Sequence, residues 1–390
     1  MMKKSLVALS FGTLALGIAE YVMMGILPDV SRSLNVSIPV AGHLISSYAL
    51  GVCCGAFLPV LIHRSRLKNM LLMLSLLMLV GSTLSVLSPS YAMLLIARFI
   101  SGLPHGSYFG VASIVAVRLA DENHKTGAVS IMVAGMTVAN LFGVPLGTAM
   151  SSHISWRFPF ILVMFVSLIV MYYIWKWVPD IGALPDKGFK DQFRFLKSPA
   201  PWLILSATMF ANGGIFCWYS YISPLLIEEG GFSPSMLSAL MILAGFGMVV
   251  GNMMSGRLCD IHRPGYVVAY TQLIAIASLL LIFFFADNGL LSVILMIVCA
   301  GCLFAVGSPQ QFLILRHAPG GELLGGASIQ TAFNLGNALG ALFGGIPISY
   351  GLSPRYSALV GVPMVIMGLV SFIIFNKRYE RRGDASAAAM

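Results

Sequence analysis

Residues 70–87 read MLLMLSLLMLVGSTLSVL, a stretch without a single charged side chain. A helix needs about 20 mainly apolar residues to cross the hydrocarbon core of a bilayer. Similar runs, each ended by proline, glycine or charged residues, recur along the whole chain. The stretch therefore predicts one membrane-spanning helix among many.

The apolar runs form two sets of six. Lipid-exposed backbone groups must be paired internally, and the alternating pattern of a membrane barrel is missing, so these runs predict helices. Lys3 and Lys4 resemble the start of a signal peptide, but no small-residue cleavage site follows before Glu20, and the first run is kept as a helix. We expect an all-α membrane protein with twelve spans, near residues 5–27, 39–62, 70–87, 92–117, 127–150, 158–178, 201–227, 235–255, 264–286, 289–315, 324–350 and 356–376.

The composition agrees with this class. Only 9% of the 390 residues are charged and 58% are hydrophobic, whereas soluble domains carry about 25% charged residues. In a soluble protein the net charge of +9 would suggest binding to nucleic acid. Here the basic residues gather in loops on one side of the predicted membrane, so they indicate topology, and no nucleic-acid partner is expected. Cytoplasmic loops collect Lys and Arg. With both termini in the cytoplasm, all 23 basic residues fall on that side except Arg32, Arg98, Arg157 and Arg355.

The chain divides into two halves that resemble each other. Residues 1–178 and 201–376 each hold six runs, joined by a cytoplasmic linker at 179–200, and 377–390 form a cytoplasmic tail. Within the linker, FKDQFRFLK at 189–197 could lie on the membrane surface as an amphipathic helix. The run from Gly127 to Gly147 aligns with the run from Gly325 to Gly345, which indicates two six-helix pseudo-repeats, as in alternating-access carriers.

Few ionisable residues lie inside the spans. Each costs on the order of 2.5 to 3.5 kcal/mol at a helix centre, so such residues indicate function. Glu20 and Arg98 lie at equal depth, which would allow them to pair, and His105 lies two turns deeper on the Arg98 face. We expect these three to couple transport to protons. A purely structural ion pair, and a histidine that merely bridges helices, are the alternatives.

Polar side chains at helical spacing predict a substrate cavity, with hydrogen bonding between helices as the alternative. The second half contributes most of them and carries no charge opposite Arg98. The predicted cavity residues are His43, Asn140, Asn212, Phe216, Tyr219, Gln330, Asn334 and Asn337. All six cysteines lie in or beside apolar runs, so we expect no disulfide, metal or other cofactor.

Three motifs point to a family. After the eighth run, the stretch GRLCDIHR contains Gly256, Arg257, Leu258 and Asp260. At the corresponding place after the second run, Pro59 replaces the acidic residue. Arg98 and Gly102 follow an RxxxG pattern in the fourth run. The fifth run contains Gly143, Pro145 and Gly147, a partial antiporter motif.

These motifs resemble the drug:proton antiporter branch of the major facilitator superfamily. The strings AEYVMMGILP around Glu20, SGLPHGSYFG around His105 and SWRFPF around Trp156 are most similar to its arabinose efflux permease group. The resemblance covers essentially the whole chain. It implies that the Asp260 motif latches the cytoplasmic side, that Arg98 takes part in proton coupling and that Gly143, Pro145 and Gly147 are associated with export.

We therefore expect a secondary transporter of the bacterial inner membrane, acting as a monomer. It would export a small organic solute, such as a sugar, a sugar-like metabolite or an amphipathic drug, by proton antiport. Its partners would be the solute, protons and the lipid bilayer. Uptake by proton symport is the alternative. A receptor or enzyme is disfavoured, because no soluble catalytic domain, phosphate-binding GxxxxGK[ST] loop or cluster of His and Cys is present.

Overall fold

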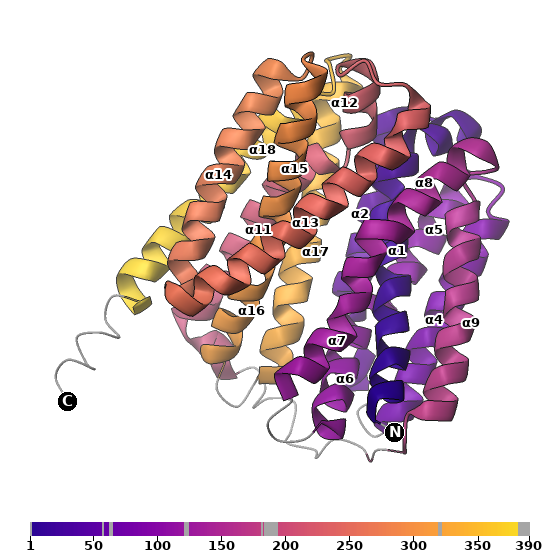
Figure 1. Cartoon of the computed structure of the whole chain (residues 1–390), viewed down its shortest axis with the longest axis vertical. Coiled ribbons are helices and arrows are strands. Elements are labelled where there is room, and N and C mark those ends of the chain that lie inside the picture. Colours follow the sequence, from indigo (N-terminus) through magenta and orange to yellow (C-terminus); the bar gives the residue numbers. More distant parts are fainter. Residues whose placement is uncertain are drawn as a thin grey trace. The chain divides into compact units, whose positions relative to one another are not determined.

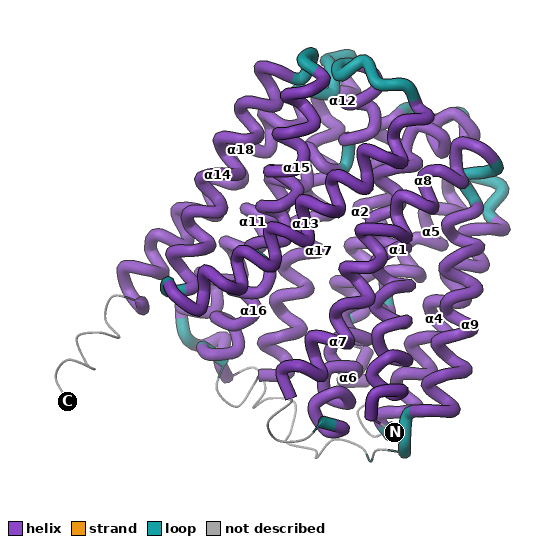
Figure 2. The backbone as a smooth tube through the Cα atoms, in the orientation of Figure 1, coloured by secondary structure: helices purple, strands orange, loops and turns teal. Residues whose placement is uncertain are grey.

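The computed structural model describes residues 2–56, 58–61, 65–120, 125–180, 182, 194–318 and 322–380. Within these ranges every regular element is helical, and turns or short loops join the helices (Figure 2). By length and composition, 11 described helical stretches could cross a membrane. Helix α17, Glu322–Ser349, adds another of 28 residues, in which three amide side chains interrupt the apolar surface. The prediction of an all-α fold with twelve long helices is confirmed.

The chain forms two compact units. Unit 1 comprises Met1–Lys187 with Pro234–Ile242, and unit 2 comprises Gly188–Ser233 with Leu243–Met390. Figure 1 shows their helices in sequence colours. The described elements of unit 1 are α1 (Met2–Leu34), α2 (Ile38–Gly55), α3 (Leu58–Leu61), α4 (Leu67–Leu87), α5 (Tyr91–Gly102), α6 (Pro104–Leu119), α7 (Lys125–Val138), η2 (Ala139–Gly143), α8 (Val144–His153) and α9 (Phe158–Trp177).

The remaining described elements follow the linker. They are η3 (Arg194–Lys197), α11 (Pro199–Tyr219), α12 (Ile222–Glu228), η4 (Pro234–Met236), α13 (Leu237–Ile261), α14 (Pro264–Phe285), α15 (Gly289–Ala305), α16 (Gly307–Arg316), α17, α18 (Tyr356–Phe375) and η5 (Asn376–Glu380). Of these, η4 and the start of α13 cluster with unit 1.

Helix α1 is the centre of unit 1. It packs against α7, α8, α9 and α2, and α4 runs alongside α9 (Figure 1). Most of α1 is buried by these neighbours. Its polar residues accordingly find partners across helices: the Thr13 hydroxyl donates to the Met132 carbonyl at 2.6 Å. A side chain on α1 therefore faces other helices of the unit, which makes this helix a suitable carrier of a buried functional group.

Several runs that the sequence presents as single helices are broken in the structure. The run at 92–117 divides between α5 and α6, and the run at 127–150 contains the π-helical turn η2. In both, a proline follows the break at once, Pro104 or Pro145. Proline lacks an N–H and its ring clashes with the preceding turn, so the regular hydrogen-bond ladder cannot continue through it.

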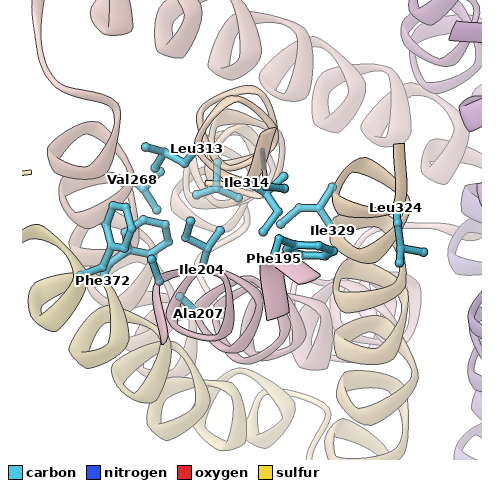
Figure 3. Packing of buried hydrophobic residues seen from close by; sticks show 13 residues of the cluster. Phe195, Ile204, Ala207, Val268, Leu313, Ile314, Leu324, Ile329 and Phe372 are labelled. Atoms are coloured by element: carbon cyan, nitrogen blue, oxygen red, sulfur yellow. The ribbon is translucent and has the colours of Figure 1, made fainter. Parts of the chain in front are cut away.

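Unit 2 is built around α11, which packs closely against α17 and α18. A buried apolar cluster joins α11, α14, α16, α17 and α18 at one end of the unit (Figure 3). Phe195 of η3 belongs to this cluster and is 5% exposed. Of the predicted surface helix FKDQFRFLK, residues 189–193 lie outside the described residues. The rest forms a short 3-10 turn in which Phe195 is buried in this cluster, and the surface helix stays a prediction.

Candidate functional site

Arg98 lies completely buried in unit 1, with 0% of its surface exposed. It reaches from α5 to two backbone carbonyls: Nη1 donates to Ala19 of α1 at 2.6 Å, and Nε donates to Leu44 of α2 at 3.4 Å. Its guanidinium carbon stands 4.4 Å from the centre of the Tyr48 ring. The Nη2 atom is buried without a hydrogen-bond partner. A buried cation with an unused donor is a costly arrangement, which favours a functional role.

Glu20 and His105 lie beside this arginine. Both are buried, and Oε2 of Glu20 stands 3.8 Å from Nε2 of His105. The Nδ1 atom of His105 is 2.9 Å from the Tyr48 hydroxyl, and its ring stacks on Phe109 with 5.3 Å between centroids. Glu20 and Arg98 also interact electrostatically. Glu20, Tyr48, Arg98 and His105, from α1, α2, α5 and α6, form what we name the unit 1 polar cluster.

The predicted proton-coupling residues are thus brought together, but in an arrangement that the sequence did not indicate. The Glu20 carboxylate lies 3.8 Å from His105 and also interacts with Arg98, and Arg98 donates hydrogen bonds to two carbonyls. Tyr48 is a member of this cluster that the sequence pattern did not single out. A tyrosine deep inside an apolar span needs a hydrogen-bond partner for its hydroxyl, which is the signal that would have singled it out.

Two predicted cavity residues of unit 1 lie outside this cluster. His43 is exposed, and its Nδ1 atom is 3.5 Å from the hydroxyl of Tyr91. Asn140 is buried in the π-helical turn η2, where its amide donates to the Met136 carbonyl of the preceding turn at 3.0 Å. Neither interaction reaches Glu20 or Arg98. Their role in substrate binding remains a prediction.

The predicted cavity residues of unit 2 gather on α11 and α17. The Asn212 amide donates to Oδ1 of Asn337 at 2.5 Å and to the Phe333 carbonyl at 3.1 Å. This is the hydrogen bonding between helices that the sequence left open as the alternative to substrate contact. Also on these helices, Phe216 and Tyr219 are buried with ring centroids 5.9 Å apart, and Asn334 donates to the Gln330 carbonyl at 3.0 Å.

The antiporter-like motif lies where α8 meets other helices of unit 1. A Cβ atom on Gly143 would meet Ile18 of α1, and one on Gly147 would meet Val22. The carbonyl of Pro145 accepts a hydrogen bond of 2.8 Å from Ser238. The motif thus serves close packing in this structure, which is compatible with its predicted association with export.

The predicted latch lies at the end of α13. Arg257 and Leu258 are exposed, and a Cβ atom on Gly256 would meet nothing within 4 Å. The side chain of Asp260 lies outside the described residues. Nearby, Arg263 donates to the Glu380 carbonyl at 2.8 Å. The gating role of this motif stays a prediction.

Comparison with known proteins identifies the family. The model of the Major Facilitator Superfamily matches residues 9–328. The chain belongs to the major facilitator superfamily. It is therefore a multi-pass membrane transporter and not an enzyme, as the sequence predicted. The resemblance to the arabinose efflux group also agrees with AraJ of Escherichia coli, which is 43% identical over 390 residues, with 100% of this chain and 99% of the relative covered.

Other members of the superfamily show more distant similarity. The inner membrane transport protein YdhP of Escherichia coli is 35% identical over 95% of each chain. A "Probable sugar efflux transporter" of Helicobacter pylori is 26% identical, covering 90% of this chain and 89% of its own. Among solved structures, a bacterial homolog of the human lysosomal transporter Spinster has a TM-score of 0.76 at 16% identity, covering 97% of this chain and 98% of its own. A D-xylose-proton symporter has a TM-score of 0.75, also at 16% identity, over 95% and 96%. These two likenesses concern the fold.

Proposed function

We propose that this chain exports a small organic solute in exchange for protons. A sugar or sugar-like metabolite is the first candidate for that solute. The observation that carries the proposal is the buried carboxylate of Glu20 beside His105 and Arg98. Ionisable groups inside a membrane protein mark ion and proton pathways. The sugar efflux transporter of Helicobacter pylori supports export, and the inner membrane transport protein YdhP supports a location in the inner membrane. The sorting of basic residues supports cytoplasmic termini.

In the proposed mechanism Glu20 carries the proton and Arg98 regulates it. Burial penalises the charged carboxylate and favours the bound proton, whereas a nearby guanidinium, which is always charged, favours its release. A movement that separates Glu20 from Arg98 would therefore favour the protonated carboxyl group, and a movement that brings them together would favour proton release. Substrate that binds the two states differently then shifts their populations, which couples solute movement to the proton.

A flux measurement tests the proposal. Purified protein would be reconstituted in liposomes loaded with labelled pentoses, hexoses or a cationic amphiphile, and a pH gradient, acid outside, would be imposed. We expect the gradient to drive solute out. Glu20→Gln keeps the size of the side chain but cannot ionise, so it should lose gradient-driven efflux and retain downhill exchange. Glu228→Gln, which changes an exposed acid at the end of α12, is the matched control.

Three outcomes separate the alternatives. If a pH gradient with the acid side outside drives solute inward, the protein is a proton symporter. Undiminished gradient-driven flux in well-folded Glu20→Gln protein would remove Glu20 from the mechanism. Loss of both gradient-driven and downhill transport, with a normal elution profile, would mean that Glu20 has a structural role or binds the solute and does not carry the proton.

A further inference from the structure

Tyr48 occupies a central place in the unit 1 polar cluster that the proposed proton exchange does not explain. Its side chain is 1% exposed, and its hydroxyl has two contacts among the described residues: it stands 2.9 Å from Nδ1 of His105 and donates a long hydrogen bond of 3.5 Å to the Leu16 carbonyl. A phenol has one proton to donate. Hydroxyl hydrogen bonds to oxygen usually measure 2.5 to 3.0 Å, so the contact to Nδ1 competes better for that proton than the long bond to Leu16, and we take Nδ1 as its acceptor.

This assignment fixes the hydrogen positions on the histidine. A neutral imidazole has one N–H and one accepting nitrogen. Because Nδ1 accepts from Tyr48, the hydrogen must be on Nε2. The Nε2 atom is the one that faces Glu20, at 3.8 Å from its Oε2. The donor side of the ring is therefore directed at the carboxyl group, and a small approach of α1 and α6 would complete a hydrogen bond.

The ionisable neighbours of Glu20 come from three other helices. Among the described residues, Glu20 interacts with Tyr48 of α2, Arg98 of α5 and His105 of α6. The Tyr108 hydroxyl, also on α6, is directed at the Leu9 carbonyl, 3.3 Å away. The ring of Tyr48 separately carries the guanidinium of Arg98 on its face. The hydroxyl and the ring of Tyr48 thus have distinct contacts.

We infer that Tyr48 is a positioning residue for proton exchange: its hydroxyl holds His105 in the Nε2–H tautomer, which donates to the carboxylate form of Glu20. A donor favours the charged carboxylate over the protonated acid, so this tautomer promotes proton release. The opposite tautomer would present an accepting nitrogen, which favours the protonated acid. The inference rests on the proposed role of Glu20 and adds the group that sets its hydrogen-bond partner.

Tyr48→Phe tests this inference, because it keeps the ring under Arg98 and removes only the hydroxyl. The pH at which solute exchange is half-maximal should rise by about one unit, since a hydrogen bond to a charged group is worth about a tenfold change in proton affinity. Tyr108→Phe is the matched control, because it removes another buried hydroxyl of the same unit that does not contact His105.

A spectroscopic measurement reads the histidine tautomer directly in the parent protein. Nitrogen NMR of histidine-labelled parent protein in lipid nanodiscs should show His105 protonated on Nε2 alone, with the signal assigned by its loss in His105→Gln. In Tyr48→Phe the two tautomers should become mixed. Nδ1–H in the parent would overturn the inference, as would an unchanged pH midpoint in Tyr48→Phe.

The Glu20→Gln experiment tests the proposed function separately from the positioning role of Tyr48. Gradient-driven flux that survives Glu20→Gln would end the proposed function itself. Loss of that flux in Glu20→Gln, together with a parental pH midpoint in Tyr48→Phe, would remove only the positioning role of Tyr48.

Discussion

The interiors of the two units share their packing but differ in charge. In unit 1, α5 carries the buried Arg98, and the position 201 residues later in α15 is Cys299, which is equally buried. Unit 2 uses the neutral pair Asn212 and Asn337 where unit 1 uses a carboxylate, an imidazole and a guanidinium. Under the proposed function, this difference would divide the work: unit 1 would handle protons and unit 2 would provide neutral hydrogen bonding.

One close helix contact occurs in both units. A Cβ atom on Gly51 of α2 would meet the Phe99 carbonyl of α5, and one on Gly251 of α13 would meet the Gly301 carbonyl of α15. Helices in membranes associate through such close backbone approaches, because water exclusion does not drive them together. The two units thus share this kind of contact, whereas their buried polar groups differ.

The starts of the last helices show a similar divergence. Arg157, before α9, donates to the Val86 and Ser88 carbonyls at 3.1 and 2.9 Å. Arg355, at the corresponding place before α18, instead forms an ion pair with Glu229. Both arginines tie the start of a helix to the end of another one. Only unit 2 uses a charged acceptor for this purpose.

The largest effect should come from Arg98, a fully buried charge without a counterpart among the described buried residues of unit 2. Arg98→Lys keeps the charge but lacks the planar fork that reaches two carbonyls and lies on the Tyr48 ring. We expect a loss of at least about tenfold in gradient-driven flux, the scale of one hydrogen bond to a charged group. The initial rate of efflux from proteoliposomes measures it. Cys299→Ala in unit 2 is the control and should stay close to the parent, and equal losses in the two variants would contradict the division of labour.

The second prediction concerns the neutral pair of unit 2. Asn212→Ala removes the hydrogen bond to Asn337 inside the bundle and should lower stability by about 1 to 3 kcal/mol. The pH midpoint of transport should not move, because neither amide ionises. Thermal unfolding and the pH profile check the two parts. A shifted midpoint in Asn212→Ala would show that unit 2 takes part in proton handling, and the double variant Asn212→Leu with Asn337→Leu should recover part of the stability.

The third prediction tests the packing that the units share. Gly51→Ala and Gly251→Ala would each force a methyl group against a backbone carbonyl, so each should destabilise its unit by about 1 to 3 kcal/mol. Gly110→Ala in α6 is the control, because its Cβ would meet nothing within 4 Å. Thermal unfolding of the three purified variants provides the measurement. A large cost in only one of the first two variants would mean that the repeat has not kept equivalent contacts.

The smallest expected effect is a pH dependence at the end of unit 2. His317 lies between Phe375 and Tyr379, and burial lowers its pKa below the ordinary value of 6.5. The unfolded chain therefore binds the proton more readily, so this histidine should cost stability as the pH falls below its ordinary pKa. His317→Phe should reduce the drop in unfolding temperature between about pH 7.5 and about 5.5. The exposed His153→Phe of unit 1 serves as the control, and an equal drop in parent and His317→Phe protein would contradict the prediction.

The sequence by itself determined the membrane class, the count of long helices and the family. Those features depend on hydrophobic run length, on the energetic cost of unpaired backbone in lipid and on motifs within single runs, all of which are local along the chain. It also singled out Glu20, Arg98 and His105, because charge inside an apolar run is visible without knowing any neighbour. It presented the runs at 92–117 and 127–150 as single helices, although Pro104 and Pro145 already marked where the ladder would break.

Only the tertiary structure decided which groups meet. Glu20, Tyr48, Arg98 and His105 come from four helices, and the distances between their polar atoms depend on how each helix is rotated about its axis. Equal depth along the bilayer normal says nothing about that rotation. The sequence could therefore suggest that Glu20 pairs with Arg98, but not that the carboxylate would also lie 3.8 Å from His105 or that the guanidinium would donate to two carbonyls. The close approach of helix backbones at glycines such as Gly51 fixes the rotation. Packing across the whole unit, and not any local pattern, therefore set the chemistry of this site.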